Sequence, residues 1–456
     1  MSVTGASMKH GAQRDLLLIR GGTVVTGQAS LRVDVLCGGV GEILAVGPEL
    51  EAPSGCTIID ADGLLVLPGG VDPHTGIGAD AVGFAATRDA LAGGTTTVID
   101  VMQPQGGDMA QAWRDWRQAA AHAPVDVGLC MGLPGGGGAV MGGMDMLAGR
   151  GVNSFHLSMA AGMADRDILD LATHAAGLGA LCVIEAQNAQ AMAYLRAALD
   201  HAGVSAAEAC PLACPPAIEA DAVGRAIMLA GLVGAPVHVG PVSTAGACAA
   251  IIAARARAER VQAHVLAPHL VLDEAVYDAD DASPYLIRPP LRDGMHRRAL
   301  WGALACGAVG MVASGFSPAG RPGHGVAGGL AERMRVVWRH SVQAGVMEAE
   351  EFVRATSEAA AMAFNIYPRK GAIMPGADAD LVLWNPDAQE MRPASAGGLY
   401  GGIALGGQPE CVIRGGVVAF RAGALQEGAG SGAYVPCPAF RPGLSARLRQ
   451  AARLSV

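Results

Sequence analysis

Aromatic and charged residues are scarce in this chain. They make up 4% and 16% of the 456 positions, whereas hydrophobic residues reach 51%. This composition excludes an intrinsically disordered chain. No run of about 18 residues is free of charged or polar interruptions, so we expect no membrane partner. The 32 Lys and Arg are outnumbered by 41 Asp and Glu, and the net charge of −9 argues against nucleic acid as a partner.

Cysteine is present without a metal-binding pattern. The ten Cys are scattered, and the C-x₃-C pair Cys210 and Cys214 has no second pair with which to complete a zinc site. The first fifteen residues lack the apolar stretch of a secretory signal. We therefore expect a cytoplasmic, reduced, globular protein whose free cysteines fill the core.

Two kinds of pattern alternate along the chain. Short apolar runs separated by glycine turns occupy 16–69 and return at 379–384 and 410–420, which is typical of β-strands. Between them, apolar runs alternate with alanine-rich helical stretches such as 109–123 and 217–234. Strand and helix in alternation indicate a parallel sheet with helical crossovers. We predict an α/β fold with a (β/α)8 TIM barrel over 68–375 and a small β-sandwich domain built from both chain ends, 1–67 and 376–456. Periodicity alone would also allow an open doubly wound sheet.

Several stretches carry a more specific signal in a fixed order. DGLLVLPGGVDPHTG (62–76), LAGGTTTVID (91–100), GVNSFHLSMA (151–160), RPPLRD (288–293) and the long segment 352–386 that includes YPRKGAI are the clearest. Together they resemble the dihydropyrimidinase and hydantoinase group of cyclic amidohydrolases, from about residue 16 to 440. The resemblance implies a homotetrameric barrel with a β-sandwich side domain that hydrolyses a small cyclic amide or ureide. In that group two divalent metals generate hydroxide and polarise the carbonyl.

The metal ligands that the resemblance implies are only partly present. The group has an H-x-H on strand one, a carbamylated Lys on strand four, single His on strands five and six, and an Asp on strand eight. The corresponding positions here are His74 and Gly76, His156, Glu185, His238 and Gly315. A bridged two-metal centre is excluded, because imidazole cannot form the lysine carbamate and glycine offers no ligand.

The substitutions suggest a reduced metal site. His156, Glu185 and His238 would lie on adjacent strand ends with His74 across the mouth, and two imidazoles with a carboxylate can hold one zinc or a similar divalent metal. The other interpretation is that these are polar residues lining the cleft after metal loss. Catalytic candidates are His74, Glu185 and His324, the last as a proton donor near position 315.

Substrate contacts are altered as well. Ala161 stands where the resemblance implies a Tyr that donates to the developing oxyanion. The segment that could bind a ring amide through its backbone is unchanged and consists of Pro289, Pro290 and Leu291. Ser317 is a further substrate-binding candidate. Ser314 and Ser317 lack an adjacent base in the sequence, so we expect solvent or capping roles for their hydroxyls. His264 and His269 are predicted on loops of the same barrel face, at the surface or behind the ligands.

Two functions remain open. The first is an enzyme that acts on a small cyclic amide or ureide through at most one metal. The second is a catalytically inactive homologue that serves as an oligomeric scaffold or partner subunit, since the motifs that shape the fold are intact while those that perform the chemistry are not. The sequence favours the enzyme slightly. The expected partners are a small-molecule substrate and further copies of the chain, as a dimer or tetramer.

Overall fold

The core of the molecule is a barrel of eight parallel strands. In the computed structural model, residues 16–318, 328–393 and 398–440 are described. The strands follow one another around the barrel in sequence order. They are β8 (Gly70–Thr75), β9 (Thr95–Met102), β10 (Asp126–Gly132), β11 (Ser154–Ser158), β12 (Leu181–Glu185), β13 (Val237–Val239), β14 (Val261–Leu266) and β15 (Met311–Ala313). The predicted barrel is confirmed, and the open doubly wound sheet is not observed.

Backbone hydrogen bonds join the last strand to the first. Gly315 N–H donates to the His74 carbonyl at 3.1 Å, and Gly76 N–H donates to the Phe316 carbonyl at 2.7 Å. Asp72 strengthens this seam, because its carboxylate accepts the Ser314 N–H at 3.1 Å. The two positions at which glycine replaces an expected ligand therefore form part of the closure of the barrel.

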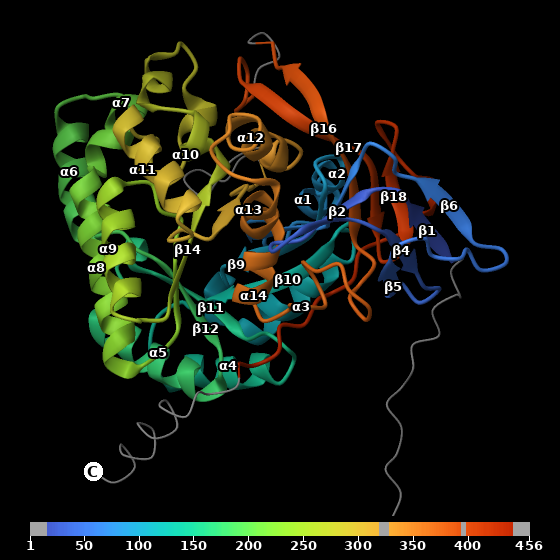
Figure 1. The fold of residues 1–456 in the computed structure, drawn as a ribbon. Helices are drawn as coiled ribbons and strands as arrows, with labels where there is room; N and C mark the ends of the chain where they lie inside the picture. Colours follow the sequence, from blue (N-terminus) through green and yellow to red (C-terminus); the bar gives the residue numbers. More distant parts are fainter. Residues whose placement is uncertain (1–15, 319–327, 394–397, 441–456) are drawn as a thin grey trace, which may run out of the picture.

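Helices surround the strands, as Figure 1 shows. Those that follow β8–β12 along the chain are α1 (Ala81–Ala85), α2 (Arg88–Ala92), α3 (Met109–Ala120), α4 (Gly138–Ala148), α5 (Asp165–Leu178), α6 (Ala189–His201) and α7 (Ala206–Ala213). The rest are α8 (Pro216–Val233), α9 (Ala245–Ala256), α10 (Ala267–Val271), α11 (Gly294–Ala305), α12 (Arg333–His340), α13 (Ala349–Val353) and α14 (Ala359–Ala363). Phe364, directly after α14, packs with Val71, Ile99 and Val183 in a buried cluster that fills the barrel interior.

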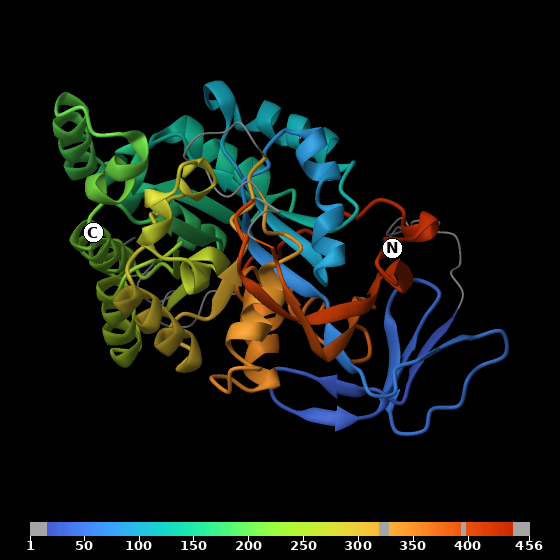
Figure 2. The ribbon, with the colours of Figure 1, turned by 90° about the horizontal axis from the view of Figure 1, so that it is seen from above.

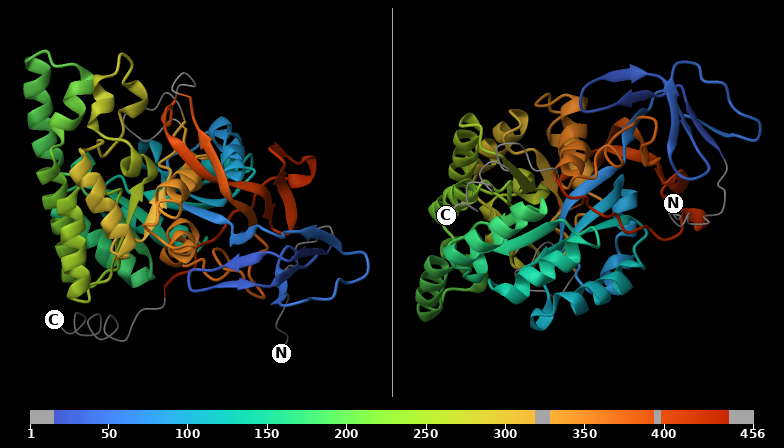
Figure 3. Two further views of the ribbon diagram at one scale, coloured as in Figure 1. Left: turned by 45° about the horizontal axis from the view of Figure 1, so that its top comes forward. Right: turned by 90° about the horizontal axis from the view of Figure 1, so that it is seen from below.

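Both chain ends contribute strands to the β-domain. Figures 2 and 3 show the first and last strands side by side next to the barrel. One sheet has the order β5-β4-β1-β6 and the other β19-β18-β17-β16-β7-β2-β3. Their bounds are β1 (Leu17–Arg20), β2 (Thr23–Val25), β3 (Ser30–Arg32), β4 (Asp34–Cys37), β5 (Ile43–Gly47), β6 (Thr57–Asp60), β7 (Leu65–Pro68), β16 (Leu381–Met391), β17 (Ala404–Arg414), β18 (Val417–Arg421) and β19 (Ala424–Leu425).

A buried lysine connects this domain to the barrel. Lys370, from the YPRKGAI motif, has a side chain that is 1% exposed. Its ammonium contacts the carboxylates of Asp380 at 2.7 Å and Asp378 at 2.9 Å, and also that of Asp126 on β10. Arg414 on β17 pairs with the same Asp126 at 3.2 Å. Because these charged groups are largely removed from water, the cost of desolvating each one is offset by its oppositely charged partners.

Within the described segments, no helix is both long and apolar enough to cross a bilayer.

Candidate functional site

The candidate residues come from the carboxyl ends of the barrel strands. His74 lies on β8, His156 on β11, Glu185 at the end of β12 and His238 on β13. The strand register places His156, Val183 and His238 at one level, and Ser158 and Glu185 two residues further on. In a barrel of this kind the carboxyl ends of the strands meet at one mouth, which is where active sites form.

His264 is a member of this cluster. The prediction that His264 and His269 lie on loops is wrong, since His264 is in β14 and His269 is in α10, and their burial excludes the surface position that was one of the two alternatives. Residues two apart on a strand face the same side, so His264 points inward above Gln262. The His238 Nε2 and His264 Nδ1 atoms are 2.7 Å apart, and the rings cross at 82°. One nitrogen must donate and the other accept, so this pair shares one proton.

The remaining polar groups form separate pairs. Gln103, directly after β9, places its side-chain nitrogen 3.0 Å from Nδ1 of His156. Gly132 makes this crossing possible, because a Cβ there would lie 2.0 Å from the Gln103 side-chain oxygen. Ser158 donates its hydroxyl to Glu185 at 2.6 Å.

Several buried nitrogens at the mouth have no hydrogen-bond partner within the described residues. They are Nδ1 of His74, Nδ1 of His238 and Nε2 of His264. Gln187, two residues beyond Glu185, is 2% exposed, and neither atom of its amide has a partner. A buried polar group without a partner costs roughly 1–3 kcal/mol, so this cluster has strong unused hydrogen-bonding capacity.

Burial keeps the imidazoles neutral. It lowers the pKa of His74 to about 3, and the imidazoles of His156 and His238 add to the shift. Burial and the His156 imidazole lower the pKa of His238 to about 3. The pKa of His264 also falls, chiefly through burial. For His156, burial lowers the pKa while the Glu185 carboxylate acts in the opposite direction. At neutral pH each ring therefore offers one donor and one acceptor.

These contacts do not assemble a metal site. In the parts of the chain that the structure describes, no three or more His, Cys, Asp or Glu side chains are arranged to hold a metal ion. His238 uses Nε2 on His264, and Glu185 accepts the Ser158 hydroxyl. Neutral imidazole is the ligand form that a metal needs, but the donors do not converge on one point. A divalent metal on His156, Glu185 and His238, with His74 nearby, therefore stays a prediction that the observed contacts do not support.

Leu266 occupies the space beside Gly315, the position at which the resemblance implies an aspartate. Gly315 has φ +67°, and a Cβ built there would lie 2.9 Å from a Leu266 methyl group. Leu266 is itself buried at the end of β14. A carboxylate at position 315 would meet both an unfavourable backbone conformation and an apolar neighbour.

The predicted substrate contacts already have protein partners. The Pro289 carbonyl is 2.9 Å from Nε2 of His269, and Leu291 N–H donates to the Tyr277 hydroxyl at 2.9 Å. Pro290 is buried between them. The Ser317 hydroxyl donates to the Gly76 carbonyl at 3.2 Å, as expected for a capping role. Substrate binding by these groups stays a prediction.

Two further candidates are placed differently. His324 lies outside the described residues. Ala161 follows Ser158 and donates its N–H to the Ser158 hydroxyl at 3.2 Å. The site therefore has the methyl group of Ala161 where the resemblance implies a phenol.

Sequence reasoning missed Gln103 and Gln187 and misplaced His264. Gln103 follows the motif LAGGTTTVID, and Gln187 follows Glu185, so their positions at strand ends were a usable signal. The inward direction of His264 could be read from its two-residue spacing to Gln262 once that strand was assigned.

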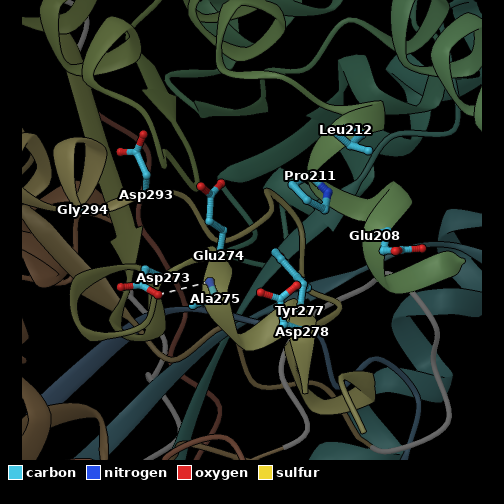
Figure 4. A pocket seen from close by; sticks show the side chains of 10 residues that line it. All are labelled: Glu208, Pro211, Leu212, Asp273, Glu274, Ala275, Tyr277, Asp278, Asp293 and Gly294. Atoms are coloured by element: carbon cyan, nitrogen blue, oxygen red, sulfur yellow. Dashed lines mark hydrogen bonds between the residues drawn. The ribbon is translucent and has the colours of Figure 1, made fainter. Parts of the chain in front are cut away.

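An acidic pocket is lined by segments that follow β12 and β14. It has a volume of about 560 Å³, and five carboxylates line it, those of Glu208, Asp273, Glu274, Asp278 and Asp293 (Figure 4). Three of them cap helices: Asp293 accepts backbone N–H groups of α11, Asp273 caps the short helix Glu274–Asp278, and Glu208 is part of a capping box on α7. Helix capping explains these three charges without a ligand.

The parallel barrel, its polar carboxyl mouth and the β-domain built from both chain ends define an amidohydrolase-type barrel. Residues 157–418 match the model of the Amidohydrolase family. The chain is 32% identical to a dihydropyrimidinase of Arabidopsis thaliana over 463 residues, which covers 94% of this chain and 87% of the relative. It is also 32% identical to dihydropyrimidinase-related protein 5 of Homo sapiens over 461 residues, which covers 93% and 81%.

Solved structures agree with the sequence relatives. The crystal structure of dihydropyrimidinase from Brevibacillus agri NCHU1002 superposes with a TM-score of 0.88 at 28% identity, covering 93% of this chain and 99% of that one. The chain belongs to the amidohydrolase family as a dihydropyrimidinase-like member. The family expected from the sequence motifs is thereby confirmed.

Proposed function

We propose that this protein binds a small cyclic amide or ureide at the barrel mouth and does not hydrolyse it through paired metals. The observation that carries the proposal is the set of unpartnered buried nitrogens on His74, His238 and His264. Names of relatives such as dihydropyrimidinase support the ligand class, because a dihydropyrimidine ring contains a cyclic ureide.

The ring chemistry matches the unused groups. A cyclic ureide alternates N–H donors and carbonyl acceptors along one edge and carries no charge. Neutral imidazoles can take either role, and the Gln187 amide could supply a donor and an acceptor together. A neutral ring would satisfy these groups without introducing a charge into a buried site.

Hydrolysis makes further demands on the site. An amide carbonyl must be polarised and a water activated, and loss of one oxyanion donor alone costs about two to three orders of magnitude in rate. Gly315 cannot act as a base, and Ala161 cannot donate to an oxyanion. A single divalent ion held by His156, Glu185 and His238 is the enzyme hypothesis that remains; we derive no catalytic step through it, because the contacts do not bring these donors together.

Calorimetry and activity assays together test the proposal. Dihydrouracil and hydantoin are titrated into the protein, and hydrolysis is followed with and without added zinc. We expect binding and no zinc-dependent turnover. Replacement of His74 by Leu, which removes an unpartnered nitrogen, should weaken binding about tenfold, since one buried hydrogen bond is worth about 1.4 kcal/mol.

The control variant is His122→Gln, which changes an exposed histidine away from the mouth. Zinc-dependent hydrolysis that disappears in His238→Ala would refute the proposal in favour of the single-metal enzyme. Failure of both rings to bind at millimolar concentration would also refute it.

A second function, as an oligomeric scaffold, has its own support. The outer faces of α8 and α9 expose Met228 at 50% and Ile252 at 46%. Figure 1 shows these two helices side by side on the outside of the barrel. We infer a homo-oligomer, dimer or tetramer, in the cytoplasm, with this face against another copy. Light scattering of Met228→Glu/Ile252→Glu should show a smaller assembly than the unchanged protein, and an unchanged mass would contradict the assignment.

A further inference from the structure

A buried carboxylate on β9 holds the segment that follows His74. Asp100, near the end of this strand, is 0% exposed. Its Oδ1 atom accepts the Thr75 hydroxyl at 3.0 Å and the Ile77 N–H at 2.7 Å. Its Oδ2 atom accepts the Gly78 N–H at 3.0 Å. Three of the four residues after His74 are therefore bonded to one side chain.

The fourth hydrogen bond comes from a helix. The indole N–H of Trp116 on α3 donates to Oδ2 of Asp100 at 2.9 Å. The Trp116 ring is itself buried and packs edge-on against Phe84 of α1. Three of the four partners are N–H groups, which can only donate, so the arrangement is matched to the ionised form of the carboxyl group.

Pairing with β9 leaves the strand irregular at His74. The register of β8 against β9 shifts between Asp72 and Thr75, and pairing resumes where Thr75 lies opposite Asp100. On its other side, the backbone of His74 and Gly76 bonds to the segment that follows β15. The bonds to Asp100 are therefore the second anchor of the segment that carries His74 into the mouth.

We propose that Asp100 is a positioning residue, which holds residues 75–78 so that His74 is presented to a ligand at the barrel mouth. The proposal rests on the function proposed above and concerns a side chain that does not itself contact the ligand. Without this carboxylate the Ile77 and Gly78 N–H groups lose their acceptor. The ligand then has to order the segment as it binds, and the cost of that ordering weakens the affinity.

Protonation of Asp100 offers a test that leaves the chain unchanged. Burial raises the pKa of Asp100 to about 6, so the group is mostly ionised at pH 7.5 and mostly protonated at pH 5. A proton on either oxygen meets a backbone N–H that also donates, so the bonds to the segment weaken. The groups that face the carboxyl from β8, its following loop, α3 and β10 are Thr75, Ile77, Gly78, Trp116 and Cys130. Of these only the Cys130 thiol titrates, and burial raises its pKa and keeps it neutral.

Amide hydrogen exchange of Ile77 and Gly78 in the full chain measures the positioning directly. After correction for the intrinsic effect of pH, we expect both amides of the unchanged protein to exchange about tenfold faster at pH 5 than at pH 7.5. Asp100→Asn should exchange fast at both pH values, because either orientation of its amide turns the NH2 group toward one of these N–H groups. Asp115→Asn, at an exposed position of α3, should behave like the unchanged protein.

Calorimetric titration with dihydrouracil measures the consequence for the ligand. The affinity of the unchanged protein should fall about tenfold between pH 7.5 and pH 5. Asp100→Asn should bind about tenfold more weakly at pH 7.5 and show no further fall at pH 5, which a general loss of stability would not produce. Asp115→Asn is again the matched control.

Three outcomes would decide against the proposal or separate it from the function of the mouth. Equal protection of Ile77 and Gly78 in Asp100→Asn and the unchanged protein would overturn it, as would altered protection with unaltered affinity. If Asp100→Asn does not fold, exchange in the unchanged protein that is the same at both pH values overturns it. If the unchanged protein binds no ring at either pH, the function proposed for the mouth fails, and the exchange rates still decide whether Asp100 holds the segment.

Discussion

Buried histidines should make the stability of this protein depend on pH. His269 is the clearest case, because burial lowers its pKa to about 4. Its Nε2 lies 2.9 Å from the Pro289 carbonyl, so the ring is held in place by α10 and the RPPLRD segment. In the unfolded chain the pKa returns to about 6.5. The folded state therefore favours the neutral ring, and protonation favours unfolding.

The size of the effect follows from the two pKa values. The stabilising contribution is fully present above about pH 6.5 and is lost progressively as the pH falls toward 4. Between pH 7.5 and 5.5 the unfolded chain takes up the proton and the folded chain does not, which costs about 1.4 kcal/mol for this one residue. His74 and His238, with pKa values of about 3, change stability in the same direction. Asp100 opposes them, since burial raises its pKa to about 6 and favours the folded state as the pH falls.

Replacement of His269 by Gln isolates the contribution. The Gln side chain retains an N–H donor for the Pro289 carbonyl but does not titrate. Urea unfolding at pH 7.5 and 5.5 can be followed by fluorescence of Trp301, whose indole N–H donates to the Leu270 carbonyl next to His269. We expect the variant to lose about 1.4 kcal/mol less stability than the unchanged protein between these pH values. His122→Gln serves as the exposed control. Equal losses in His269→Gln and the unchanged protein would refute the reasoning.

Three further substitutions test the fold and the mouth. Lys370→Met removes the buried cation that the carboxylates of Asp126, Asp378 and Asp380 share, so urea unfolding should show a loss of about 3–5 kcal/mol. Arg32→Met, which breaks an exposed pair, should lose at most about 1 kcal/mol, and similar losses in both would contradict the network. Gly315→Asp should lower the free energy of unfolding by at least about 2 kcal/mol, because residue 315 has φ +67° and its side chain would contact Leu266. The variant should also gain no hydrolysis of dihydrouracil. Unchanged stability or measurable turnover would show that position 315 tolerates a carboxylate. Gly132→Val should displace Gln103 from His156 and weaken dihydrouracil binding measured by calorimetry. Gly142→Val, at a glycine with open space around it, should leave the affinity unchanged. Equal affinities in Gly132→Val and the unchanged protein would show that Gln103 does not act through His156.

The alternation of apolar runs with alanine-rich helices was sufficient to predict a parallel sheet with helical crossovers, and the resemblance to the family distinguished the barrel from an open doubly wound sheet. Parallel strands buried on both faces need continuous apolar segments, and helical crossovers need the length that separates them. The order of short motifs from DGLLVLPGG to YPRKGAI identified the family. Lys370 in those motifs is a buried polar residue whose contacts with three carboxylates help to hold the structure together.

The identity of residues at the former ligand positions was also readable from the chain. Gly76 and Gly315 have no side chain that could coordinate a metal, so the sequence alone predicts a site without the paired metals of the group, and this stays a prediction. His324 and the predicted domain boundaries at 67/68 and 375/376 remain predictions of the sequence alone.

What only the tertiary structure decided is which polar groups meet. The His238–His264 contact joins strands 26 residues apart, and the Gln103–His156 contact spans 53 residues. Such pairs depend on strand register, on side-chain direction and on the space beside Gly132. The residue types near each position in the sequence do not determine these three features together. The same holds for Leu266 beside Gly315, because the register of β14 against β15 places the ends of these two strands next to each other.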